Sequence, residues 1–156
     1  MNQALQAKLK TLPRTPGVYF HKSASGEVIY VGKAAVLKNR VRQYFQDSRG
    51  RDNKTMALVA EIFDTDWIET ESEVDALFLE SEMIKRYMPR YNVLLRDDKS
   101  QMYVRIDMKS DWPTVSFTRN PADDGAEYFG PFYNGFALKK ALRYLRRIFP
   151  YLTHQR

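Results

Sequence analysis

Residues 16–34 read PGVYFHKSASGEVIYVGKA, two short apolar runs separated by a polar segment. The segment SASG at 23–26 contains the small polar residues and glycine that are typical of a tight turn. The runs therefore predict an antiparallel hairpin with strands over 17–21 and 28–33. Each strand contributes one tyrosine, although a hairpin core needs no hydroxyl groups.

The register of this hairpin follows if residues 23–26 form its loop. The other cross-strand partners are then opposite charges or matched apolar residues: Lys22 with Glu27, Phe20 with Ile29, and Val18 with Val31. Tyr19 lies opposite Tyr30, and both side chains lie on one face of the sheet. Taken alone, the pair favours packing over chemistry, because tyrosine is a good strand former.

Outward from the hairpin, apolar periodicity and turn residues predict the remaining elements. The N-terminal part is predicted to hold a helix within 5–13 that ends before Pro13, helices over 36–46 and 53–63, a strand over 64–70, and a helix over 73–88. Ser72 caps this last helix, with Asp75 at the capping-box position, and Pro89 ends it. A boundary is expected at 95–100, followed by strands over 102–107 and 114–118, a loop over 120–128 and a helix over 136–149.

The bulk composition limits the class of protein. The chain has 156 residues, 44% of them hydrophobic, with no cysteine and a net charge of +6. These values favour a globular protein with a polyanionic partner, nucleic acid ahead of a membrane surface. No apolar run approaches the length of about 20 residues that a membrane span needs, and cytoplasm is the expected location.

Two groups of charged residues stand out. Four cations lie within ten residues after the hairpin, namely Lys33, Lys38, Arg40 and Arg42. Arg40 is four residues before Tyr44, so the two share a helix face, and the guanidinium suits phosphate. The alternative is a solvated basic face.

On the helix predicted over 73–88, Glu80 falls inside the apolar stripe that includes Leu77 and Ile84. A carboxylate there needs a partner. The partner is either a structural cation such as Lys33 or Arg40, a backbone donor, or a hydrated Mg²⁺, which commonly takes only one or two carboxylates.

The helix predicted over 136–149 is amphipathic. Its basic side holds Lys139, Lys140, Arg143 and Arg147, and Leu138, Ala141 and Leu142 lie on the other. DNA contact, a solvated face and a partner-protein surface all remain open for this basic side.

The assembled residues Gly17-Val18-Tyr19, Tyr30-Val31-Gly32-Lys33, Arg40, Tyr44, Glu80 and Asn92 resemble the GIY-YIG nuclease family, with GVY for GIY and YVG for YIG. GEVIYVGKA, EVDALFLESEMIKRYMPRYNVLLRDDKS and LRRIFP are similar to the N-terminal half of the UvrC family of excinucleases. The resemblance implies an α+β GIY-YIG fold, with a three-stranded antiparallel sheet flanked by helices over 12–96. A β-β-α extension over 97–156 would follow.

The resemblance also implies residue roles. Glu80 would bind one divalent ion, Mg²⁺ or Mn²⁺. Tyr19 and Tyr30 would line the site, one of them acting on the attacking water. Lys33, Arg40 and Tyr44 would contact the scissile phosphate, and Asn92 would complete the site. Lys33, Arg40 and the metal are expected to favour a phenolate, with Tyr30 the preferred base. The alternative is a hydroxyl that only orients the water or binds the hydration shell of the metal. Neither His21 nor His154 is assigned a role.

The implied activity is metal-dependent DNA cleavage on the 3′ side of a lesion in nucleotide excision repair. The implied partners are lesion-containing double-stranded DNA and excinuclease subunits B and A. Members of the UvrC family are much longer, so the chain is expected to be either a fragment or a short relative. The alternatives are a non-cleaving module that binds DNA or a repair partner, and a GIY-YIG nuclease outside excision repair.

Overall fold

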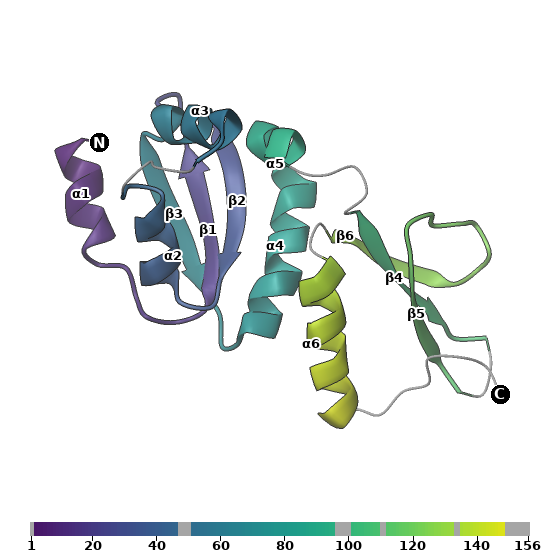
Figure 1. The fold of residues 1–156 in the computed structure, drawn as a ribbon. Helices are drawn as coiled ribbons and strands as arrows, with labels where there is room; N and C mark the ends of the chain where they lie inside the picture. Colours follow the sequence, from purple (N-terminus) through teal and green to yellow (C-terminus); the bar gives the residue numbers. More distant parts are fainter. Residues whose placement is uncertain (1, 47–50, 96–100, 110–111, 133–134, 149–156) are drawn as a thin grey trace. The chain divides into compact units, whose positions relative to one another are not determined.

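The computed structural model describes residues 2–46, 51–95, 101–109, 112–132 and 135–148 (Figure 1). These residues form two compact units, one within residues 1–96 and the other within 97–156. The boundary expected at 95–100 lies almost wholly outside the described residues, as does His154. No helix in the described ranges is long and apolar enough to cross a membrane.

The first unit has a three-stranded antiparallel sheet with helices on both faces (Figure 1). The strand order is β2-β1-β3, which makes β2 and β3 the two edges. The elements are α1 (Gln3–Leu9), β1 (Gly17–Lys22), β2 (Val28–Ala34), α2 (Leu37–Gln43), α3 (Asn53–Glu61), β3 (Asp64–Glu69), α4 (Glu73–Tyr87) and α5 (Arg90–Leu95). All but α5 match a predicted element.

Helix α4 begins and ends as its sequence predicts. The side chain of Ser72 accepts a hydrogen bond from the backbone of Asp75, which satisfies one of the free donors of the first turn. Met88 takes the left-handed conformation with φ of 43° and closes the helix before Pro89. The helix packs against β1 and β2, and the ring of Tyr87 lies 6.1 Å from that of Phe20.

The predicted register of the hairpin is wrong by two residues. Tyr19 lies opposite Gly32, and Tyr30 lies opposite His21. The ladder is irregular between His21 and Lys22, where β2 contributes one extra residue, a β-bulge. Because side chains alternate with period two, a two-residue slip leaves Tyr19 and Tyr30 on the same face, and their rings are 6.2 Å apart.

Gly32 is required by this register. A Cβ atom at Gly32 would lie 2.3 Å from the hydroxyl of Tyr19, so only glycine leaves room for the ring. Tyr19 is 1% exposed and belongs to the main apolar cluster, which also holds residues of α1, α2 and α3. The glycine of the YVG segment therefore seats the tyrosine of the GVY segment.

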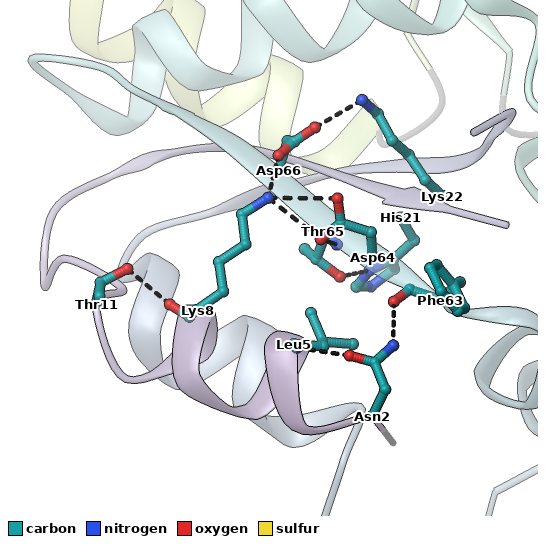
Figure 2. A network of polar contacts seen from close by, with 10 residues as sticks. All are labelled: Asn2, Leu5, Lys8, Thr11, His21, Lys22, Phe63, Asp64, Thr65 and Asp66. Carbon is teal, nitrogen blue, oxygen red and sulfur yellow. Dashed lines mark hydrogen bonds and ion pairs between the residues drawn. The ribbon is translucent and has the colours of Figure 1, made fainter. Parts of the chain in front are cut away.

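A polar network fastens α1 to β3 (Figure 2). Asn2 caps α1 by accepting from the Leu5 amide at 2.7 Å, and it donates to the carbonyl of Phe63 at 2.9 Å. The ammonium of Lys8 contacts the carboxylates of Asp64 and Asp66. Lys22 also pairs with Asp66, at 2.6 Å, instead of with Glu27 as predicted. The network holds α1 against the β3 edge of the sheet.

The second unit holds another antiparallel sheet, of strand order β5-β4-β6, and one helix. Its elements are β4 (Met102–Asp107), β5 (Thr114–Thr118), β6 (Glu127–Phe132) and α6 (Gly135–Ile148). The loop predicted over 120–128 is wrong at its end, because Glu127 and Tyr128 begin β6 and pair with β4. The extension is therefore β-β-β-α. In α6, Leu138 is fully buried and the predicted cations are exposed.

Candidate active site

Three tyrosines predicted for the site meet in one cluster. The hydroxyls of Tyr19 and Tyr44 are 2.8 Å apart and share a hydrogen bond. The ring of Tyr30 lies 6.2 Å from each of the other two rings. Tyr30 is only partly buried, whereas Tyr19 is almost fully buried. Of these two, only Tyr30 therefore presents surface to a ligand.

His21 packs against the three tyrosines. The sequence did not predict this position for His21. It is fully buried, its ring is 4.6 Å from that of Tyr44, and it stacks on Tyr30 at 6.1 Å. Its Nδ1 shares a hydrogen bond of 2.9 Å with Thr65 Oγ1, while Nε2 has no partner among the described residues. Burial, with a smaller contribution from Arg40, lowers the pKa of His21 from 6.5 to about 3. The imidazole is therefore neutral and supports the tyrosine rings.

Arg40 stands beside the tyrosines on α2. Its guanidinium lies over the ring of Tyr44 at 5.5 Å, as the four-residue spacing predicts. The tyrosine hydroxyls, Tyr19 first, raise the pKa of Arg40 further. Arg51 binds the end of this helix, donating to the carbonyls of Tyr44 at 2.8 Å and Gln46 at 3.2 Å and to that of Gln43. A cation bonded to those carbonyls stabilises the turn that holds Tyr44.

Glu80 lies on α4 and interacts electrostatically with Arg40 and Tyr30 of the tyrosine cluster. It is largely buried, and burial raises its pKa to about 7, against the opposing charges of Lys33 and Arg40 and the Lys33 amide. Within the described residues Glu80 forms no ion pair, and Lys33 pairs instead with Glu73 at 3.7 Å. The predicted ion-pair alternative for Glu80 is therefore not realised.

Asn92 is bonded to the strand that carries Tyr30. Its side-chain amide donates to the carbonyl of Val31 at 2.8 Å and its oxygen accepts from the amide of Val31 at 2.8 Å. Both bonds satisfy backbone groups on the free edge of β2. Asn92 thus fixes the strand that carries Tyr30 and Lys33, and its amide is already in use.

Two of the other predicted cations lie apart from this cluster within the first unit. Lys38 and Arg42 lie two residues either side of Arg40 and therefore project from a different flank of α2. Lys139, Lys140, Arg143 and Arg147 belong to the second unit.

The expected phenolate is not favoured by the protein groups alone. Burial raises the pKa of Tyr19 well above its ordinary value, and neighbouring Tyr44 and Tyr30 add to the effect. Burial likewise raises the pKa of Tyr30, with Tyr44 and Glu80 contributing. Arg40 lowers both pKa values by a smaller amount. Without a bound ion, burial thus outweighs Arg40 at these two hydroxyls, and the phenolate stays a prediction that depends on the metal.

The residues nevertheless fit a hydrated divalent cation. An ionised Glu80 is a hard oxygen ligand in a largely buried position, and the burial that raises its pKa is a cost that a bound cation would offset. Nowhere in the described ranges do three or more His, Cys, Asp or Glu side chains gather in a way that could hold a metal. A single carboxylate with several waters is the coordination that Mg²⁺ accepts.

This geometry defines a class of protein. A solved structure, described as the GIY-YIG N-terminal endonuclease domain of UvrC from Thermotoga maritima bound to its catalytic divalent cation, magnesium, superposes with a TM-score of 0.52. The two are 35% identical, and the match covers 59% of this chain and 99% of that one. Further structures of that domain carry single tyrosine-to-phenylalanine substitutions with the cation bound. The class is that of the GIY-YIG endonuclease domains.

The family to which the chain belongs is narrower than this class. Residues 15–93 match the family described as the UvrC-like GIY-YIG domain, and the chain belongs to it. UvrABC system protein C of Caldanaerobacter subterraneus subsp. tengcongensis is 47% identical over 149 residues, and that of Clostridium perfringens is 50% identical over 148 residues. These matches cover 96% and 95% of this chain but 24% of each relative, so the chain spans about a quarter of their length.

Proposed function

We propose that this chain is a metal-dependent DNA endonuclease of nucleotide excision repair that cuts on the 3′ side of a lesion. The observation that carries the proposal is Glu80, a largely buried carboxylate without an ion pair among the described residues, beside Arg40 and Tyr30. The relatives are named as components of the UvrABC system. Lesion-containing double-stranded DNA is therefore the proposed substrate, subunits A and B are the proposed partners, and cytoplasm is the proposed location.

Glu80 would hold the divalent ion, Mg²⁺ or Mn²⁺, with water completing the coordination. An ion bound there would polarise a phosphoryl oxygen and lower the pKa of a bound water. Arg40 donates two parallel hydrogen bonds to the phosphate, and Lys33 adds positive charge from β2. Asn92 is a positioning residue, because its amide holds the Val31 backbone within two residues of Lys33.

The partial exposure of Tyr30 supports it as the tyrosine that contacts the attacking water. With its pKa raised by burial, the hydroxyl donates or accepts a hydrogen bond to orient that water while keeping its own proton. Tyr19 acts through Tyr44, because their hydroxyls bond to each other. Tyr44 in turn supports Arg40 through its ring.

The basic face of α6 would add a second contact with DNA. Its cations project from one side of the helix, and the ammonium of Lys139 lies 5.7 Å from the ring centre of Phe117. The proposed DNA-contacting residues, besides Lys33 and Arg40, are Lys38, Arg42, Lys139, Lys140, Arg143 and Arg147. Binding through these residues predicts a steep loss of affinity with salt.

The test is cleavage of an end-labelled duplex with one lesion, in the presence of subunits A and B, with Mg²⁺ or with chelator. Glu80→Gln is compared with Glu82→Gln, which removes an exposed carboxylate from the same helix. We expect a Mg²⁺-dependent cut 3′ to the lesion that Glu82→Gln retains and Glu80→Gln loses. Equal cleavage by the two variants would show that Glu80 is not a ligand of the metal. A cut 5′ to the lesion would overturn the assigned side, and binding without any cut would favour a non-cleaving module.

A further inference from the structure

A basic groove lies between α1 and α2, apart from the tyrosine cluster. The two helices lie side by side (Figure 1), and the groove encloses about 450 Å³. Seven residues line it: Gln6, Leu9 and Lys10 from α1 and its C-terminal end, and Lys38, Arg42, Phe45 and Gln46 from α2 and the residues after it.

The groove has an apolar floor and cationic walls. Leu9 and Phe45 pack with the main apolar cluster and form the floor. Lys10, Lys38 and Arg42 supply three positive charges, and no carboxylate is among the described residues that line the groove. Across the part of the chain that the structure describes, none of the three makes an ion pair or a side-chain hydrogen bond. Three cations around one concave surface, without an ion-pair partner among the described residues, attract an anion with several charges.

The groove and Arg40 lie on different flanks of one helix. Lys38 and Arg42 face α1, whereas Arg40 lies over the ring of Tyr44. An α-helix with its side chains is about 10–12 Å wide, and phosphates follow one another every 3.4 Å or so along the axis of one DNA strand. A strand that crosses α2 would therefore bring a phosphate a few nucleotides from the scissile bond over the groove.

The wall that α1 forms is held in place. Asn2 and Lys8 fasten this helix to Phe63, Asp64 and Asp66 at the edge strand β3 and the residue before it (Figure 2). Lys10 follows Lys8 by two residues and lies on the groove side. The cations are thus presented from two anchored elements, which reduces the ordering that binding would require.

We propose that this groove binds the phosphodiester backbone of DNA a few nucleotides from the scissile phosphate, as a second anchoring point for the substrate strand. The proposal rests on the proposed DNA endonuclease function. The amide side chains of Gln6 and Gln46 donate hydrogen bonds to phosphate or sugar oxygens, and Phe45 packs on the deoxyribose. Such contacts set the register of the strand and read no sequence.

The test measures DNA binding by the whole chain in chelator, so that no cleavage occurs. A labelled duplex of about 20 base pairs is titrated at several salt concentrations. The double variant Lys38→Ala/Arg42→Ala is compared with Lys85→Ala/Arg86→Ala, which removes one lysine and one arginine from exposed positions of α4. The circular dichroism melting curve of each variant checks that it is folded.

We expect the groove variant to bind roughly tenfold more weakly, with a slope of log affinity against log salt shallower by about two. The control should stay within about twofold of wild type. In a duplex with one lesion, which defines the scissile bond, single methylphosphonates each neutralise one phosphate. They should weaken wild-type binding at a position a few nucleotides from that bond and have no effect there on the groove variant.

Equal losses of DNA affinity in both double variants, or no loss in either, would overturn the proposed DNA binding by the groove. That result is distinguishable from failure of the proposed function. If the groove variant loses affinity while wild type never cuts DNA, the endonuclease assignment fails and the groove stands.

Discussion

The two edges of the N-terminal sheet both carry charged side chains, but they use them differently. At the β3 edge Lys8 and Lys22 face Asp64 and Asp66, and each charge has a partner of opposite sign (Figure 2). At the β2 edge Glu80 is largely buried and has no ion pair within the described residues. Asp64 and Asp66 at one edge thus have cationic partners, whereas Glu80 at the other has none in an ion pair among the described residues.

From this difference we expect the charges at the β3 edge to be structural and the charge of Glu80 to be functional. The β3 pairs are about two-fifths exposed at the carboxylates, so they add little stability and need no ligand. For Glu80 burial outweighs the nearby charges of Lys33 and Arg40, and such a carboxylate is kept where a ligand supplies further positive charge. Changes at the β2 edge should therefore impair catalysis, and changes at the β3 edge should slightly reduce stability.

After the loss of cleavage expected for Glu80→Gln, the largest effect is expected for Arg40→Ala. Loss of a two-pronged phosphate donor should reduce Mg²⁺-dependent cleavage about 100- to 1000-fold, the range typical of removing one preorganised charge-stabilising donor. Initial cleavage rates on the lesion duplex measure it. Arg86→Ala, which removes an exposed guanidinium that lies over Tyr87, is the control and should cleave normally. A decrease under about fivefold would mean that Arg40 does not contact the phosphate.

The next largest effect is the loss of stability in acid that buried His21 should cause. The unfolded chain binds a proton on His21 below pH 6.5, while the folded chain does so only near pH 3. The free energy of unfolding should therefore fall as pH decreases from 6.5 to 3, by a few kcal/mol, on the order of 1.4 kcal/mol for each pKa unit. Denaturant titration of His21→Leu should show a flatter profile over this range.

Thr65→Val is the matched control for His21. It removes the same hydrogen bond to Nδ1 but keeps the buried imidazole. Its stability should be lower at every pH, while the acid dependence of wild type remains. An equally steep profile in His21→Leu would show that another group causes the acid dependence.

Glu80 should produce the opposite pH dependence. Between pH 4.5 and about 7 the folded chain holds a proton on Glu80 that the unfolded chain has released. In chelator, its contribution to the free energy of unfolding therefore decreases as pH rises through this range, by about 1–3 kcal/mol. Because Mg²⁺ requires the ionised carboxylate, the ion should raise the melting temperature more at pH 8 than at pH 6. Glu80→Gln should lose both effects, and a Mg²⁺ shift that survives in this variant would place the ion elsewhere.

The features that sequence predicts here depend on periodicity. Glu80 was found because it interrupts an apolar stripe on a well-capped helix. The tyrosines were placed on one face correctly because a two-residue slip preserves alternation. The slip itself was missed, since the bulge beside His21 has no local signal. Strand β6 was missed because FGPF contains glycine and proline, which are typical of loops and edges.

Contacts between residues far apart in the chain have no periodic pattern in the sequence that would predict them. Thr65 follows His21 by 44 residues and Asn92 follows Val31 by 61, and each contact exists only because the folded sheet brings the partners together. The groove between α1 and α2 arises in the same way, since its cations come from two helices. Sequence identified the residue types of the site, and tertiary structure decided which of them meet.

The smallest effect is expected at the β3 edge, for Asp66→Asn. Lys22 first and Lys8 second hold the pKa of Asp66 below its ordinary value, so the pairs stabilise the fold above pH 3.8 and are lost as pH falls below it. Because the Asp66 side chain is 40% exposed, the loss at pH 7 should be below about 1 kcal/mol and shrink further in high salt. Thermal melting against Glu71→Gln, which removes an exposed carboxylate just beyond β3, measures it. The Mg²⁺-dependent shift should be unchanged, because the proposed ion site is at the opposite edge; a reduced shift would mean that the two edges are coupled through the sheet.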